Sequence, residues 1–123
     1  MSASAKVYEY PNCSTCKKAL KWLDAHGVEV ERVHIVDAPP SAATLKKLWK
    51  RSGLELGKFF NRSGQSYRNG NFKDKLPTMS EAEQLAALAA DGKLIKRPLL
   101  VTDTAVLVGF SEDAYAELFD GGR

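Results

Sequence analysis

The sequence predicts an α/β domain with a mixed four-stranded sheet, ordered β-α-β and then β-β-α, with a helical insertion between the two halves. Three observations support this fold class. The N-terminal part reads as strand, helix and strand, and such a unit has parallel strands joined by a right-handed crossover. Two apolar strands near the C-terminus are joined by so short a link that only an antiparallel hairpin fits. The stretch between these halves has helical spacing, so a mixed sheet covered by helices is the economical arrangement.

The first strand, helix and second strand follow from the spacing of apolar residues. Residues 6–10 read as a short strand, which Pro11 and Asn12 end. A helix follows from Ser14, because apolar side chains recur three and four residues apart, and Gly27 ends it. This apolar stripe comprises Cys16, Ala19, Leu20 and Leu23. The second strand carries Val28, Val30, Val33 and Ile35. Its alternation slips at Glu31–Arg32, which indicates a bulge or a different register.

The middle of the chain is expected to contain two helices and a long loop. Ser41, after two prolines, opens a helix that carries Leu45, Leu48 and Trp49 and ends before Gly53. Residues 61–71 are rich in glycine, serine and asparagine and are expected to be mostly loop. Ser80 and Glu83 form a capping box, so a second helix starts there and stops near Asp91–Gly92.

The C-terminal elements are a hairpin and a last helix. Residues 99–102 and 105–108 are apolar strands joined at Asp103–Thr104. Ser111 caps the last helix, whose inward face carries Ala114, Tyr115, Leu118 and Phe119. We expect one domain over residues 1–120, with the insertion at about 41–92 and a flexible tail at 121–123.

Composition and charge exclude several classes of function. The chain is 44% hydrophobic and 27% charged, which is typical of a soluble protein with a buried core. Its net charge of +3 is spread along the sequence, so we expect no direct binding of nucleic acid, which needs a concentrated basic face. No apolar run approaches the length of a membrane span, and residues 1–7 lack the apolar region of a secretory signal. We therefore expect a cytoplasmic protein without membrane contact.

The two cysteines, Cys13 and Cys16, form a C-x-x-C pair. A closed zinc site would need two more ligands, and the spacing of His26 and His34 does not match the usual histidine half of such a site. We therefore expect no metal. A permanent structural disulfide is disfavoured in a reducing cytosol, so a redox-active pair is the better interpretation.

The strand–turn–helix context assigns different roles to the two thiols. Cys13 is expected at the first turn of the helix, where unpaired N–H groups and the helix dipole favour a negative sulfur. Lys17 and Lys18 add positive charge nearby. Cys16 lies one turn further along, so we expect it to be more buried and to keep a more ordinary pKa. Cys13 is then the attacking thiol, and Cys16 resolves the mixed disulfide.

Several motifs together resemble the arsenate reductase (ArsC)/Spx family, and the resemblance extends over essentially the whole chain. They are Tyr10–Ala19, Pro39–Pro40, Lys58–Asn61, Leu76–Ser80 and Leu94–Pro98. The resemblance implies a thioredoxin-like (glutaredoxin-like) fold. It also implies that Pro98 is a cis proline facing the cysteine loop and that Arg97 is an active-site cation.

The resemblance further implies which residues surround the substrate. Reductases of this family surround the oxyanion with three arginines, and Arg97 matches one of them. The second position falls on Asn61, with Arg62 next to it, and the third falls near Gly109. Two missing charge-assisted contacts are expected to weaken oxyanion binding by about 10²- to 10⁴-fold. The residues expected to bind substrate are Asn12, Ser14, Thr15, Lys17, Asn61, Arg62 and Pro98.

The leading hypothesis from the sequence is a thiol-disulfide oxidoreductase related to arsenate reductase. Glutathione or thioredoxin would supply its electrons, and glutathione would act as reductant or co-substrate with no cofactor bound. Glutathione, glutaredoxin and thioredoxin are the expected partners. The alternative is a redox-sensing transcriptional regulator like Spx, which binds RNA polymerase and uses its C-x-x-C pair as a switch.

Overall fold

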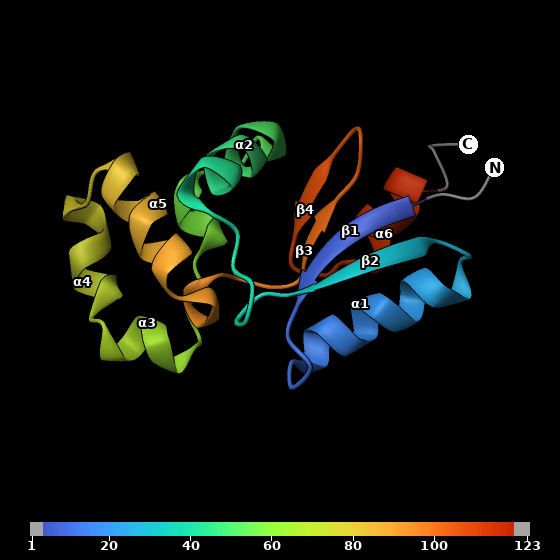
Figure 1. Cartoon of the computed structure of the whole chain (residues 1–123), viewed down its shortest axis with the longest axis horizontal. Helices are drawn as coiled ribbons and strands as arrows, with labels where there is room; N and C mark the ends of the chain where they lie inside the picture. The colour runs from blue at the N-terminus through green and yellow to red at the C-terminus, as the bar shows by residue number, and fades with distance from the viewer. Residues whose placement is uncertain (1–3, 120–123) are drawn as a thin grey trace. The chain divides into compact units, whose positions relative to one another are not determined.

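Four short strands pair into one sheet, whose spatial order is β2-β1-β3-β4. The computed structural model describes residues 4–119, so the tail predicted at 121–123 lies outside the described residues (Figure 1). The strands are β1 (Ser4–Glu9), β2 (Glu29–His34), β3 (Leu99–Val101) and β4 (Val106–Val108). β1 runs parallel to β2 and antiparallel to β3, and β3 forms an antiparallel hairpin with β4. The predicted mixed four-stranded sheet is therefore confirmed.

The chain divides into two compact units, which we describe separately. The sheet unit comprises Met1–His34 and Arg97–Arg123, and the helical unit comprises Ile35–Lys96. The prediction of one domain with an insertion at about 41–92 stays a prediction. In the described part of the chain, no helix is long and apolar enough to cross a membrane.

The bulge considered for the second strand is absent. The register of β1 and β2 is continuous, from Ser4 opposite Glu29 to Glu9 opposite His34. β2 lies at the edge of the sheet, and its exposed and half-buried residues do not alternate strictly. An edge strand is partly open to water on both faces. The adjacent side chains of Glu31 and Arg32 can therefore both reach solvent without the extra residue of a bulge.

Two helices of the sheet unit, α1 (Ser14–Ala25) and α6 (Glu112–Phe119), pack against the same core cluster. Trp22 of α1 meets the ring of Tyr115 of α6 edge-on, with ring centroids 5.6 Å apart. The buried residues of this core are Ala5, Val7, Ala19, Leu23, Val28, Leu100 and Tyr115. The expected cap of α6 is confirmed, because the Ala114 N–H donates to the Ser111 hydroxyl at 3.3 Å. This packing anchors α1, which carries both cysteines.

The helical unit contains four α-helices with short 3₁₀ turns between them. The α-helices are α2 (Ala42–Ser52), α3 (Gln65–Asn69), α4 (Phe72–Lys75) and α5 (Glu81–Ala90). The 3₁₀ turns are η1 (Leu56–Phe59), η2 (Leu76–Thr78) and η3 (Gly92–Leu94). As predicted, Ser41 caps α2, and Gly53 ends it with a φ of 72° in the left-handed region.

Residues 61–71 are mostly turn and loop, as predicted, but the short helix α3 within them was not predicted. Tyr67 of α3 is buried and stacks on Phe72, with ring centroids 6.0 Å apart. Phe60 packs on the same ring at 5.8 Å. Burial of these aromatic side chains stabilises α3 despite the weak helix propensity of the local sequence. The composition of the segment indicates only this propensity and not the burial.

Candidate active site

Cys13 lies where the loop after β1 meets the start of α1. Pro11 and Asn12 form a turn after β1, and the Cys13 N–H donates to the Tyr10 carbonyl at 3.0 Å. Cys13 has an extended backbone and caps α1: its Sγ accepts the Cys16 N–H at 3.3 Å. Its thiol is half-buried. This contact pairs one of the N–H groups at the helix start, and the half-buried thiol stays within reach of a substrate.

Cys16 lies one turn into α1 and is fully buried, and both cysteines are free thiols. Burial raises the pKa of the Cys16 thiol to about 12, and its side-chain hydrogen bond with Cys13 contributes in the same direction. The backbone of Tyr10 and the charge of Arg97 act against this rise. The predicted burial of Cys16 is confirmed. Its predicted ordinary pKa is wrong, because spacing along the helix does not show how completely the core excludes water from the sulfur.

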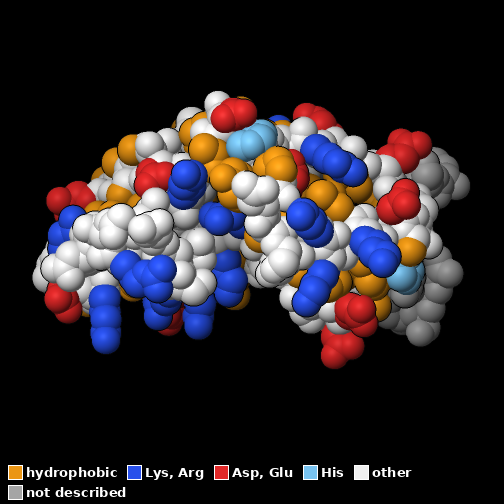
Figure 2. Space-filling view, turned by 90° about the horizontal axis from the view of Figure 1, so that it is seen from below, with side chains coloured by type: hydrophobic (Ala, Val, Ile, Leu, Met, Phe, Trp, Pro, Cys, Tyr) orange, Lys and Arg blue, Asp and Glu red, His pale blue; other side chains and the backbone are white. Residues whose placement is uncertain are grey.

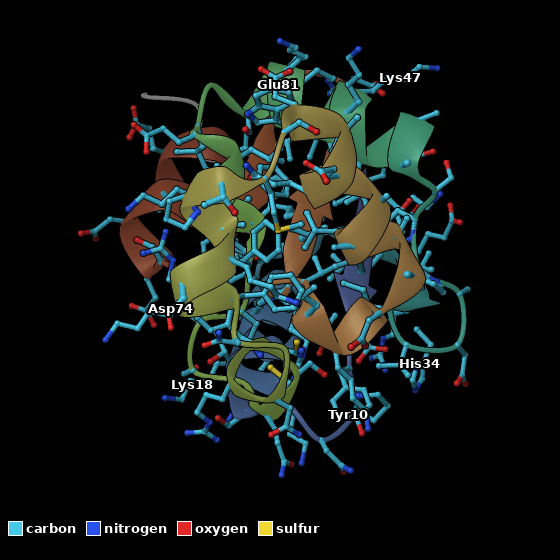
Figure 3. All side chains as sticks on the ribbon, turned by 90° about the vertical axis from the view of Figure 1, so that its left-hand side faces the viewer. Tyr10, Lys18, His34, Lys47, Asp74 and Glu81 are labelled. Carbon is cyan, nitrogen blue, oxygen red and sulfur yellow. The ribbon has the colours of Figure 1, made fainter. Side chains whose placement is uncertain are left out.

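Arg97 reaches the cysteine pair from the C-terminal half of the chain. Its guanidinium carbon lies 5.1 Å from the centroid of the Tyr10 ring. Tyr10 in turn meets the His34 ring edge-on, with centroids 5.6 Å apart, and Figure 3 shows these two labelled side chains next to each other. The Arg97 charge favours the thiolate form of Cys16. Arg97 is therefore a cation close enough for its charge to act on Cys16, with the Tyr10 ring against it.

The Arg97–Pro98 peptide bond is cis, as the resemblance implied. Pro98 is buried, and its carbonyl accepts the Gly109 N–H at 2.9 Å. Gly109, near which the third position of the resemblance falls, has a φ of 80°, a conformation that favours glycine. The Gly109 carbonyl accepts the Tyr115 hydroxyl at 3.5 Å. Burial raises the pKa of this phenol, and the charge of Cys16 adds to the rise.

The remaining predicted substrate-binding residues belong to both units. Asn12, Ser14, Thr15 and Lys17 are exposed around Cys13 in the sheet unit. In the helical unit, Asn61 is half-buried and Arg62 is exposed. The Asn61 N–H donates to the Leu94 carbonyl at 2.8 Å, and its side-chain oxygen accepts the Ser63 hydroxyl at 3.3 Å. Asn61 and Arg62 line a groove of about 250 Å³ together with Lys58 and Lys96. This groove is rich in positive charge.

The contact of Arg97 with Tyr10, that of Tyr10 with His34 and the position of Tyr115 near Cys16 were not predicted from the sequence. No spacing in the sequence links Tyr10 to Arg97, because the two lie at opposite ends of the chain. Only the pairing of β1 with β2 and β3 brings their segments together. A three-residue or larger group of His, Cys, Asp and Glu arranged to hold a metal is not present within residues 4–119.

Comparison with known proteins identifies the family. Residues 8–118 match the family model described as ArsC family. YusI of Bacillus subtilis is 54% identical over 114 residues, which cover 93% of this chain and 97% of YusI. The crystal structure of an ArsC-family-related protein from Bacteroides fragilis has a TM-score of 0.91 at 46% identity, covering 96% of this chain and 99% of that one. The global transcriptional regulator Spx of Lactiplantibacillus plantarum is 22% identical over 107 residues, covering 87% of this chain and 80% of Spx. The resemblance to ArsC and Spx proteins and the thioredoxin-like fold are therefore confirmed, and the chain belongs to the ArsC family.

Proposed function

We propose that this protein is a thiol-disulfide oxidoreductase in which Cys13 attacks the substrate and Cys16 resolves the intermediate. One observation carries the proposal: two free thiols share a helix start, the Cys16 N–H donates to Cys13 Sγ, and of the two thiols only that of Cys13 is accessible. Membership of the ArsC family and the charge of Arg97 acting on Cys16 support it. Arg97 would orient an anionic group of the substrate, such as a carboxylate of glutathione.

The proposed reaction exchanges two electrons. The Cys13 thiolate attacks one sulfur of a substrate disulfide, forms a mixed disulfide and expels the other half as a thiolate, which takes up a proton. Cys16 then loses its proton and attacks Cys13 Sγ, so that the Cys13–Cys16 disulfide forms and the bound half leaves as a thiol. The substrate gains two electrons and the protein loses two. An external thiol of the glutathione, glutaredoxin or thioredoxin class returns the protein to the dithiol state.

The second step, the attack of Cys16 on the mixed disulfide, requires the buried Cys16 thiol to lose its proton. A pKa of about 12 leaves very little Cys16 thiolate at neutral pH. Once Cys13 is bonded to the substrate, its negative charge no longer raises the pKa of Cys16, while the Arg97 charge continues to lower it. Formation of the mixed disulfide therefore favours the ionisation that resolution requires.

A trapping experiment tests this order of events. Cys16→Ser, incubated with oxidised glutathione, is expected to accumulate a mixed disulfide at Cys13, seen by mass spectrometry as one glutathione adduct. The wild-type protein is expected to proceed to the internal disulfide, and Cys13→Ser should form no adduct. Arg97→Ala is expected to slow adduct formation by about 10- to 100-fold, from the loss of one charge-assisted contact. Equal labelling of Cys16 in the Cys13→Ser protein would contradict the assignment.

The second candidate is a redox-sensing regulator that binds RNA polymerase. The similarity to the transcriptional regulator Spx supports it, and the same cysteine pair would serve as the switch. Gel filtration of the reduced and oxidised protein with purified RNA polymerase separates the two candidates. Co-migration that depends on the oxidation state of Cys13 and Cys16 favours the regulator, and separate elution favours the enzyme.

A further inference from the structure

A groove of about 550 Å³ lies between α1 and β2 of the sheet unit, and of its lining residues only Lys17 is among those expected to bind substrate. α1 contributes Lys17, Leu20, Lys21 and Asp24, which recur at the spacing of one helix face. The residues Val28, Val30 and Arg32 line the other side; they alternate along the chain and so share one face of β2 and the residue before it. One face of α1 and one face of β2 therefore line the same groove.

The groove combines an apolar floor with a positively charged rim. Leu20, Val28 and Val30 are buried or half-buried, whereas the lysines and Arg32 are exposed. Three cations and one carboxylate give the lining a net charge of 3 − 1 = +2. Seen from the α1 side, Lys and Arg side chains stand among hydrophobic ones on the sheet unit (right part of Figure 2). The complementary ligand carries both carboxylate and apolar groups.

The shape of the groove favours an extended polypeptide. β2 is an edge strand that pairs with β1 alone among the described strands, so one side of its backbone faces away from the sheet. An added strand would continue the sheet and point every second side chain into the groove. From Lys17 to Asp24, α1 rises by about 10 Å, the length of roughly three extended residues.

A second copy of this chain fits the edge poorly. Pairing of two β2 strands across a two-fold axis perpendicular to the sheet places residues of the same face opposite one another. A register centred on Glu31 or on Arg32 then sets that residue against itself. The neighbouring register centred on Val30 sets Glu29 against Glu31. Like charges directly opposite destabilise strand pairs, so a segment of a different protein fits this edge better than a second copy.

We propose that this groove binds an extended acidic segment of a partner protein, which adds a strand along β2. Carboxylates of the segment pair with Lys17, Lys21 and Arg32, and an apolar side chain between them packs on Leu20, Val28 and Val30. The proposal involves neither thiol, so it stands or falls independently of the proposed oxidoreductase activity.

Titration with a synthetic peptide tests the proposal. The probe is Thr-Glu-Thr-Val-Thr-Glu-Thr, whose Glu, Val and Glu side chains share one face of a strand, added to ¹⁵N-labelled Cys13→Ser protein. We expect saturable amide shifts in β2 and along the groove face of α1, with a dissociation constant below about 1 mM. The peptide with Lys in place of Glu is expected not to bind. Absence of saturable shifts, or shifts confined to other elements, would overturn the proposal.

Charge-reversal variants provide the matched control. Lys21→Glu combined with Arg32→Glu is expected to weaken peptide binding at least about tenfold, because two ion pairs become repulsive contacts. Lys18→Glu reverses a charge on the same helix, but Lys18 does not line the groove, so its effect is expected to stay within about twofold. An equal loss in Lys18→Glu, or self-association in sedimentation that Lys21→Glu with Arg32→Glu abolishes, would overturn the proposal.

Discussion

At the scale of single residues, the two cysteines of α1 differ in their access to water. Cys13 caps the helix and is half-buried, whereas Cys16, three residues later, is fully enclosed. The accessible sulfur receives an N–H donor at 3.3 Å, and the enclosed one has a raised pKa. Burial therefore separates two chemically identical side chains into an attacking thiol and a protected one.

This difference predicts a pH-dependent contribution of Cys16 to stability. The pKa of Cys16 rises from an ordinary value near 9 to about 12 on folding, so the unfolded chain loses this proton at lower pH than the folded protein does. The stabilisation is fully present below the unfolded pKa and is lost as pH rises toward the folded one. In urea denaturation of the reduced protein, we expect the stability difference between wild type and Cys16→Ala to shrink as the pH increases from about 9 to about 11. A difference that stays constant over this range would show that the thiol is not protected by burial.

At the scale of elements, α5 shows how local sequence starts a helix. The Ser80 hydroxyl accepts the Glu83 N–H at 3.1 Å, and the Glu83 carboxylate accepts the Ser80 N–H at 2.8 Å. This reciprocal capping box was predicted from four residues of sequence and is confirmed. In contrast, α3 has no side-chain cap, so its existence depends on burial of Tyr67. Helices that begin with a cap can be predicted from sequence, and those held by packing alone cannot.

The capping box predicts a stability loss and its pH dependence. Ser80→Ala is expected to lower the free energy of unfolding by about 1 kcal/mol, since one helix cap is lost. Hydrogen bonds from the Ser80 backbone and side chain lower the pKa of the Glu83 carboxyl. The contribution of Glu83 is therefore present above the ordinary pKa of a glutamate and is lost as the pH falls through the lowered value.

Thermal unfolding of wild type and Glu83→Gln at several pH values checks this expectation. The two proteins should converge as the medium becomes acidic, because protonation removes the charge that the substitution also removes. Glu81→Gln is the matched control, since Glu81 occupies the same first turn but makes no part of the capping box. A gap for Glu83→Gln that persists unchanged into acid would contradict the assigned role.

At the scale of the whole chain, the helical unit begins and ends at segments that pack together. Ile35 opens the unit, and a Cβ on the buried Gly92 would overlap the Ile35 carbonyl. Close to the other end, the Lys96 N–H donates to the Phe59 carbonyl at 2.7 Å. Within this unit, the segment that opens at Ile35 therefore approaches Gly92, close to the end of the unit at Lys96.

Gly92→Ala tests the importance of this approach. The new Cβ would collide with backbone atoms of Ile35, which cannot rotate away, so we expect a loss of about 1–3 kcal/mol in the free energy of unfolding. Gly57→Ala is the matched control: there the nearest atom is the Arg62 Nη2 at 3.2 Å, at the end of a flexible side chain. Denaturant unfolding of both variants is the measurement. Equal stabilities would show that the backbone at Ile35 adjusts without cost.

The sequence by itself determined the α/β class, the parallel first pair of strands, the antiparallel hairpin near the C-terminus and the position of both cysteines at the start of a helix. These features are indicated by local signals, which can be recognised without knowledge of the fold: the spacing of apolar residues, the capping residues and the C-x-x-C pair. The resemblance added Arg97 and the cis Pro98, which no local signal marks. Only the tertiary structure decided that the Cys16 side chain is buried away from water, that Arg97 lies over the Tyr10 ring and that residues 65–69 form a helix. The physical reason is that desolvation and contacts between distant segments depend on which surfaces pack together, and neighbouring residues in the sequence do not carry this information.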